Sequence, residues 1–154
     1  MSDLSAPSFT LEALALTVRK GPFLGIDWGK TNVGIAISDP HNTLSLPLEV
    51  VQAGSQLRYR LSTLWQEYQI QALIIGWPLH LDGRESLLCH PIERLALRLF
   101  RDHQWPIALF DERMTSKGVH GMLCDHKKVI DHHAAALILQ GAIHRWTHLV
   151  SQDN

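Results

Sequence analysis

The sequence predicts one layered α/β domain in which helices cover a mixed β-sheet of about five strands. Its 154 residues are close to the most common size of a single compact domain. Hydrophobic residues make up 45% and charged residues 19%, which is enough to form a core and excludes a disordered or low-complexity chain. Three apolar runs of strand length come first, and strands alternate with helical periodicity afterwards, so both antiparallel and strand–helix–strand units are expected.

The first half of the chain contributes a short helix and most of the sheet. Leu11, Leu14 and Val18 recur at nearly helical spacing before Gly21-Pro22, which predicts a short helix that caps the domain outside its main core. Residues 1–22 are therefore expected to form an N-terminal extension, and residues 23–150 the domain. Buried strands are predicted at residues 23–26, 33–38, 44–51, 72–76 and 107–110.

Helices are predicted wherever the apolar period changes from two to nearly four. One helix begins near Gln56, and a second carries Leu88 to Leu99 with Pro91 in its first turn, where proline is tolerated. Thr115 or Ser116 is expected to cap a further short helix. Asp131 is expected to open a long final helix.

Composition and charge limit the classes of partner. Fourteen Lys and Arg against fifteen Asp and Glu give a formal charge of -1, so a nucleic-acid contact would depend on a local basic patch. The two cysteines form no CxxC motif, which argues against a disulfide framework or a thiolate zinc site and favours a reduced, cytoplasmic setting. Acids precede bases in the first twenty residues, the reverse of a secretory signal, and no apolar run is long enough to span a membrane.

Three carboxylates occupy positions where ligands bind in α/β sheets. Asp27 is predicted just after the first strand, Glu112 just after the last, and Asp131 at the head of the final helix, aimed inward by the apolar stripe that it opens. Converging carboxylates repel one another unless a cation neutralises them, and Mg²⁺ and Mn²⁺ prefer such oxygen ligands. The three residues are thus candidate catalytic and metal-binding residues for phosphodiester hydrolysis, with water as the nucleophile.

Each acid also has a purely structural interpretation. Asp27 could satisfy backbone amides of a glycine-containing turn, Glu112 could be a surface acid, and Asp131 could stabilise a helix N-terminus.

The spacing of His144 and His148 suits zinc, but no further zinc ligand lies near them in the sequence, so a solvated helix face is the preferred interpretation. Trp77 is expected to pack, with stacking on an unpaired base as the alternative, and Trp28 could either wall the site or fill space between sheet and helix.

The chain resembles the YqgF (RuvX) family of RNase H-like nucleases, described as Holliday junction resolvases. Four blocks carry the resemblance in order along the chain: residues 23–29 with 33–39, residues 74–79 with Asp82-Gly83, residues 111–115, and Ile130-Asp131 with Ala134-Ala135 and residues 138–140. It implies an RNase H-like fold and a cytoplasmic nuclease that matures the 5′ end of the small-subunit ribosomal RNA precursor, pre-16S rRNA. Asp27, Glu112 and Asp131 match the acidic triad of the family.

This sequence departs from the family pattern in two places that concern substrate binding. Thr31-Asn32 stands where the family usually has a Lys-Arg pair, and the segment between Glu112 and Asp131 is shorter than the family norm. Basic residues in or beside the loops around the acids are the candidate phosphate contacts. They are Lys30, Arg84, Arg113, Lys117, Lys127 and Lys128, and all of them except Lys117 are predicted to bind nucleic acid.

Three classes of function remain open from the sequence. The preferred one is a Mg²⁺- or Mn²⁺-dependent nuclease acting on structured pre-16S rRNA or on branched DNA, as a monomer or a homodimer. The second is a nucleic-acid-binding ribosome-assembly factor without catalysis. The third is an actin-like or sugar-kinase ATPase, which the loop from Asp27 to Thr31 resembles, although 154 residues leave no room for a second lobe.

Overall fold

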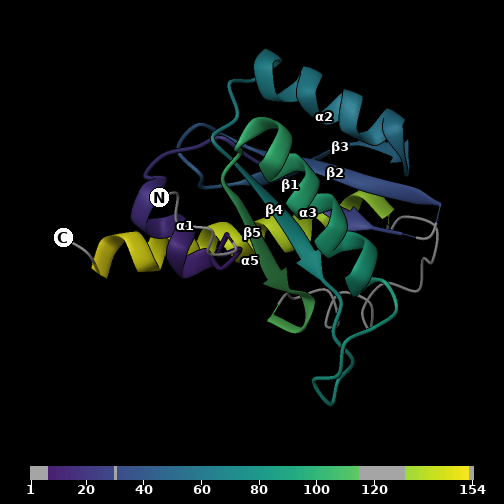
Figure 1. Ribbon diagram of the computed structural model, residues 1–154. Coiled ribbons are helices and arrows are strands. Elements are labelled where there is room, and N and C mark those ends of the chain that lie inside the picture. Colours follow the sequence, from purple (N-terminus) through teal and green to yellow (C-terminus); the bar gives the residue numbers. More distant parts are fainter. Residues whose placement is uncertain (1–6, 30, 115–130, 153–154) are drawn as a thin grey trace, which may run out of the picture.

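The computed structural model describes residues 7–29, 31–114 and 131–152, and a five-stranded sheet lies at its centre (Figure 1). The strand order is β3-β2-β1-β4-β5. The strands are β1 (Phe23–Trp28), β2 (Asn32–Ser38), β3 (Ser45–Gln52), β4 (Ala72–Trp77) and β5 (Ile107–Asp111). Short loops join β1 to β2 and β2 to β3, which pair antiparallel, whereas helices precede β4 and β5, which run parallel to β1. The sheet is mixed, as predicted.

Helices cover both faces of this sheet. The first face packs against α2 (Ser55–Glu67) and α3 (Cys89–His103), and the second against α1 (Leu11–Thr17) and α5 (Asp131–Gln152) (Figure 1). Pro91 is the third residue of α3, so the prediction of a first-turn proline is confirmed. The short helix expected after Thr115 or Ser116 lies outside the described residues. None of the helices in the described ranges is long and apolar enough to cross a membrane.

The expectation that the first helix lies outside the main core is wrong. Leu11, Leu14 and Ala15 are buried in one cluster with α5 and with β5. The Thr10 side chain caps α1 by accepting a hydrogen bond from the Ala13 N–H, and the indole N–H of Trp146 on α5 donates to the Val18 carbonyl at 3.0 Å. These contacts connect α1 to the last helix, which a local sequence pattern does not reveal. The proposed boundary between residues 22 and 23 stays a prediction.

The first strand is longer than its apolar run indicates. Asp27 pairs with Gly34 and Trp28 with Val33, so Asp27 lies within β1 and not after it. The pairing with β2 extends the strand because backbone hydrogen bonds do not require apolar side chains. The correction matters for the site, since a residue within a strand has a defined face.

Small residues let α5 approach the sheet closely. The core beneath it contains several alanines, whereas the core under α2 and α3 is made mainly of leucine and isoleucine. A Cβ atom at Gly25 would lie only 2.7 Å from the Cβ of Leu139, so the helix backbone rests directly over β1 at this point. The close approach brings the first turns of α5 to the strands that carry the candidate acids.

Candidate active site

Asp27 faces the α5 side of the sheet near the end of β1. Gly25, two residues earlier, meets Leu139 of α5 on that side, while Ile26 is buried in the core beneath α2 and α3. Because side chains alternate along a strand, Asp27 points to the same side as Gly25. Its side chain is only partly buried, so it is accessible at the edge of the sheet.

Glu112 reaches the same side from a different strand. It begins the 3-10 turn η1 (Glu112–Met114) directly after β5, as predicted, and its side chain extends back over β4. A Cβ atom at Gly76 would lie 2.6 Å from the Glu112 Oε1 atom and 2.7 Å from Cδ1 of Ile138 on α5. Gly76 therefore provides the space in which this carboxylate rests.

The register of the sheet relates these two acids. Ile26 of β1 pairs with Ile75 of β4, so Asp27 and Gly76 are the next positions on neighbouring parallel strands. The carboxylate of Glu112 lies over one of these positions and Asp27 occupies the other. The structure thus brings Asp27 and Glu112 together on one face, although 85 positions separate them in the sequence.

Asp131 is placed by its backbone as the first residue of α5. The rings of Trp146 and Phe23 meet with centroids 5.1 Å apart at the start of β1, whereas Leu139 meets Gly25 in the middle of that strand. The helix therefore runs obliquely back along β1, and its first turn lies toward the end of the strand that carries Asp27. All three predicted acids come from elements that meet at this edge of the sheet.

A complete metal cluster is not visible in the described side chains. Among them, no group of three His, Cys, Asp or Glu residues is arranged to hold a metal ion. The predicted triad has two of its members, Asp27 and Glu112, in this set, and both are carboxylates on one face of the sheet. Oxygen ligands of this kind fit a hard divalent cation such as Mg²⁺ or Mn²⁺.

Arg113 makes well-defined contacts within the protein. Its Nη2 atom donates to Oδ2 of Asp111 at 2.8 Å, its Nε atom donates to the same carboxylate at 3.1 Å, and Nη1 donates to the Leu81 carbonyl at 3.4 Å. The guanidinium of Arg113 holds the pKa of Asp111 below its ordinary value, and the carboxylate raises the pKa of Arg113. Arg113 thus joins η1 to the loop after β4, and its contact with phosphate stays a prediction.

The other predicted phosphate contacts are only partly placed. Arg84 lies in the loop after β4, where its Nε atom donates to Oδ2 of Asp82 at 2.6 Å and its side chain is 80% exposed. Lys30, Lys117, Lys127 and Lys128 lie outside the described residues. Arg84 is therefore available to solvent on the same side of the molecule as η1, to which its loop is hydrogen-bonded through Leu81.

The aromatic residues beside the acids have packing roles. Trp28 and Trp77 are partly buried against the core under α2 and α3, on the opposite face from Asp27 and Gly76. This confirms that they pack in the domain. His144 and His148 are exposed on α5, as expected for a solvated face.

The largest features near the site that sequence reasoning missed are Gly76 and the pair of Asp111 with Arg113. The signals were a glycine that ends the apolar run Ile74-Ile75 and an Asp two residues before an Arg.

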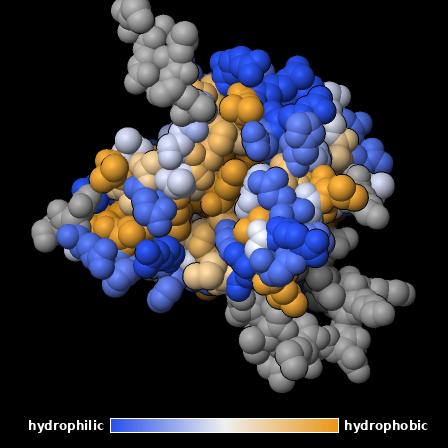
Figure 2. All heavy atoms as spheres, turned by 60° about the horizontal axis from the view of Figure 1, so that its bottom comes forward, coloured by the Kyte–Doolittle hydropathy of each residue, from blue (hydrophilic) through white to orange (hydrophobic). Residues whose placement is uncertain are grey.

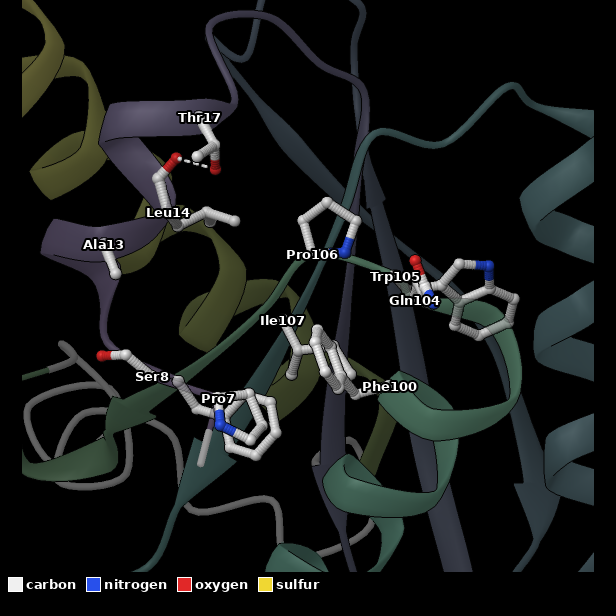
Figure 3. A pocket seen from close by; sticks show the side chains of 11 residues that line it. Pro7, Ser8, Ala13, Leu14, Thr17, Phe100, Gln104, Trp105, Pro106 and Ile107 are labelled. Carbon is white, nitrogen blue, oxygen red and sulfur yellow. Dashed lines mark hydrogen bonds between the residues drawn. The ribbon is translucent and has the colours of Figure 1, made fainter. Parts of the chain in front are cut away.

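A pocket of about 330 Å³ lies elsewhere, between α1 and the end of α3. Figure 3 shows Leu14, Phe100 and Ile107 around it, and Ile107 is at the start of β5, so this pocket is at the other end of the sheet from Glu112.

Comparison with known proteins identifies the family. The model of the family RuvX, described as Holliday junction resolvase, matches residues 21–145. The chain belongs to the RuvX family. The resemblance predicted from the four sequence blocks is thereby confirmed, and the chain is an enzyme of the nuclease class, which hydrolyses phosphodiester bonds.

Relatives of this RuvX-family chain agree with that assignment. A protein of Orientia tsutsugamushi (strain Ikeda), provisionally named pre-16S rRNA nuclease, is 34% identical over 143 residues, or 88% of this chain and 91% of the relative. A protein of Clavibacter michiganensis subsp. michiganensis (strain NCPPB 382) with the same provisional name is 35% identical over 136 residues, or 82% of this chain and 84% of the relative. The similarity thus covers most of both chains.

Solved structures support the predicted RNase H-like fold. The RuvC protein of T. thermophilus, in a complex with a Holliday junction substrate, has a TM-score of 0.55 and 14% identity, covering 85% of this chain and 96% of that one. The yeast mitochondrial Holliday junction resolvase Ydc2 has a TM-score of 0.50 and 13% identity, covering 92% of this chain and 86% of the other. At these identities the likeness concerns the fold, which the RuvX-family chain shares with the resolvases.

Proposed function

We propose that this chain is a divalent-metal-dependent nuclease that processes the 5′ end of pre-16S rRNA in the cytoplasm. The observation that carries the proposal is the carboxylate of Glu112, which rests over Gly76 on the same face as Asp27, at the edge toward which α5 begins. The provisional names of the relatives favour precursor rRNA as the substrate. Processing of that RNA implies a cytoplasmic location.

In this mechanism Asp27, Glu112 and Asp131 would hold the divalent ions, Mg²⁺ or Mn²⁺. When bound, such ions supply an activated water and neutralise the leaving oxygen during in-line displacement at phosphorus. The role of Glu112 depends on its position over Gly76, which keeps the carboxylate toward the neighbouring strand that bears Asp27. Asp27 is held by its pairing with Gly34 of β2 and follows Ile26, which pairs with β4, so it needs little reorganisation when ligands bind.

The basic residues around the acids would hold the substrate backbone. Arg84 and Arg113 extend from the loop after β4 and from η1, and Lys30, Lys127 and Lys128 belong to the segments that follow β1 and precede α5. Such residues bind phosphates without reading the base sequence. They would position a structured strand over the acids, and the shape of that strand would select the substrate.

Cleavage of a four-way DNA junction is the alternative activity, because the family model is described by that substrate. An RNA end requires one active site, whereas a symmetric junction suits a homodimer with two. The two substrates therefore also predict different assemblies, which sedimentation of the protein with each of them distinguishes.

The decisive experiment compares wild type with Asp27→Asn on end-labelled pre-16S rRNA and on a four-way DNA junction. We expect cleavage in Mg²⁺ or Mn²⁺, none in EDTA, and a loss of about 10²-fold or more in Asp27→Asn, because a metal-binding charge is removed. The matched control is Asp102→Asn, an exposed acid on α3 that pairs with Arg98 and should cut like wild type.

The outcomes separate the three functions. Preferential cleavage of the RNA supports processing of pre-16S rRNA, and preferential cleavage of the junction supports resolution instead. If the folded wild type binds but cuts neither substrate in either metal, the nuclease proposal is overturned in favour of a binding protein. Equal cleavage by wild type and Asp27→Asn would remove Asp27 from the site.

A further inference from the structure

The loop between β4 and α3 exposes two large apolar side chains beside the candidate active site. Leu81 is 94% and Leu87 is 96% exposed, more than any other large hydrophobic residue in the described ranges. Met114, at the end of η1, is 71% exposed. An apolar side chain in water contributes no burial energy to folding, so the fold itself does not account for these positions. Figure 2 shows the underside of Figure 1, where apolar side chains reach the surface among hydrophilic ones.

The tip of this loop has a defined shape. The Gly83 N–H donates to the His80 carbonyl at 2.8 Å, which closes a tight turn with Leu81 in its second position. The His80 N–H donates to the Arg84 carbonyl at 2.8 Å, and an isolated β-bridge joins Leu79 to Glu85. Gly83 has a φ of 91°, which side-chain-bearing residues rarely adopt. The turn therefore holds Leu81 outward and does not let it fold back onto the domain.

The same tip is connected to the candidate acids. Arg113 donates one hydrogen bond to the Leu81 carbonyl and the others to Asp111, and it directly follows Glu112 in η1. A hydrogen bond thus joins the loop tip to the turn that carries a predicted metal ligand.

The surroundings of Leu81 favour nucleic acid over a protein partner. Its neighbours in the turn are His80, Asp82, Gly83 and the 80% exposed Arg84, so no other apolar side chain adjoins the leucine along the turn. A stable protein interface needs a contiguous apolar area of several hundred Å², which a single side chain does not provide. Single apolar side chains such as leucine are, however, inserted between base steps by proteins that bend nucleic acid, and arginines hold the phosphates of such complexes.

We propose that Leu81 is an apolar wedge that enters an unstacked base step of the substrate beside the scissile phosphate and positions that phosphate over the acids. The proposal rests on the proposed nuclease function and adds a positioning residue to it. Leu81 does not touch the reacting atoms. It acts through the substrate backbone, and the hydrogen bond from Arg113 to its carbonyl joins it to the turn that begins with Glu112.

The test compares Leu81→Ala and Leu81→Met with wild type. The matched control is Leu16→Ala, which truncates a leucine that is 69% exposed on α1, in the part of the fold that packs at the other end of the sheet. Leu81 is almost fully exposed, so its replacement should leave the thermal unfolding temperature unchanged. Two substrates are used: a pre-16S rRNA fragment with its 5′ extension, and a four-way DNA junction, each with 2-aminopurine at the cleavage site.

The first readout is binding in Ca²⁺, where an unstacked 2-aminopurine becomes more fluorescent, and the second is cleavage in Mg²⁺ or Mn²⁺. We expect wild type, Leu81→Met and Leu16→Ala to raise the fluorescence, and Leu81→Ala to lose that rise. Leu81→Ala should also lose about tenfold in cleavage through kcat, with KM little changed, because the wedge positions the phosphate after binding.

The two readouts separate this proposal from the nuclease function. If wild type cuts neither substrate, the proposed nuclease function fails, while a fluorescence rise that depends on Leu81 still supports the wedge. If Leu81→Ala gives the same fluorescence as wild type on both substrates, or if wild type gives no rise on either, the wedge is overturned. The exposed leucines would then remain as contacts for a protein.

Discussion

The two ends of the sheet use polar residues in opposite ways. At the end where β1 begins, polar groups bind one another and the backbone: the Phe23 N–H donates to the Ser38 hydroxyl at 2.8 Å, and the Trp146 indole donates to Val18. At the end where β1, β4 and β5 finish, the carboxylates of Asp27 and Glu112 share one face that a glycine leaves free of side chain. The first end closes the fold, and the second holds the candidate catalytic acids.

Asp39 is an example of a carboxylate with a structural role at the end of the sheet where β1 begins. It lies in the turn between β2 and β3, and accepts hydrogen bonds from the N–H groups of His41, Thr43 and Leu44 and from the Thr43 hydroxyl. Burial opposes its charge, but these hydrogen bonds prevail and lower the pKa of Asp39 to about 2. A carboxylate used for structure is thus surrounded by donors from its own turn, whereas the candidate catalytic acids come from three distant segments.

The largest effect on cleavage that tests the comparison is expected from Gly76→Ala. The new Cβ would lie 2.6 Å from Oε1 of Glu112 and 2.7 Å from Cδ1 of Ile138, so the carboxylate must move away from its place over β4. We expect cleavage to fall at least about tenfold and the free energy of unfolding to fall by about 1–2 kcal/mol. Urea unfolding and cleavage assays at a temperature where the variant is folded measure the two effects.

Gly25→Ala is the matched control for this variant. Its new Cβ would lie 2.7 Å from Cβ of Leu139, an atom fixed to the helix backbone, so it should cost more stability, about 2–3 kcal/mol. It touches no carboxylate directly, so the folded variant should lose less cleavage than Gly76→Ala although it loses more stability. If the two variants lose cleavage in proportion to stability, the displacement of α5 and not that of Glu112 governs activity.

Trp146→Phe tests the closed end of the sheet. It removes the indole N–H that donates to the Val18 carbonyl at 3.0 Å, and it changes the edge contact with Phe23. We expect the free energy of unfolding to fall by about 2 kcal/mol, from a lost buried hydrogen bond and poorer packing. Cleavage by the folded variant should equal that of wild type, and a loss of rate without a loss of stability would contradict the division between the two ends.

The smallest effect is expected from Asp39→Ala and depends on pH. The folded-state pKa of about 2 lies below the ordinary value of 3.8, so the ionised carboxylate stabilises the fold above about pH 4, and this contribution is lost as the pH falls toward 2. Since the side chain is partly exposed, we expect about 1 kcal/mol at neutral pH. Urea unfolding from pH 7 to pH 2.5 should show the two proteins converging, and a constant difference would contradict this account.

Much of the fold was predictable because its signals are local. Strand β4 is a continuous apolar run, and the apolar stripe after Asp131 marks the long last helix. A helix tolerates proline only in its first turn, so Pro91 marks the start of α3. The candidate acids Asp27 and Glu112 were identified from their places at strand ends. That the two side chains share one face of the sheet could not be predicted, because it depends on the strand register. In the structure the pairing of β1 with β2 continues through Asp27 and so fixes the face on which Asp27 lies.

The sequence by itself determined most of the described secondary structure, the mixed sheet and the identity of the candidate acids, because periodicity and turn chemistry act over a few neighbouring residues. Only the tertiary structure decided that α1 belongs to the core, that Gly76 seats Glu112, and that Arg113 joins Asp111 to the Leu81 loop. These contacts join segments that are far apart in the chain. They depend on how closely α5 packs on the sheet and on which strands become neighbours. No local sequence pattern encodes that packing distance or that strand order.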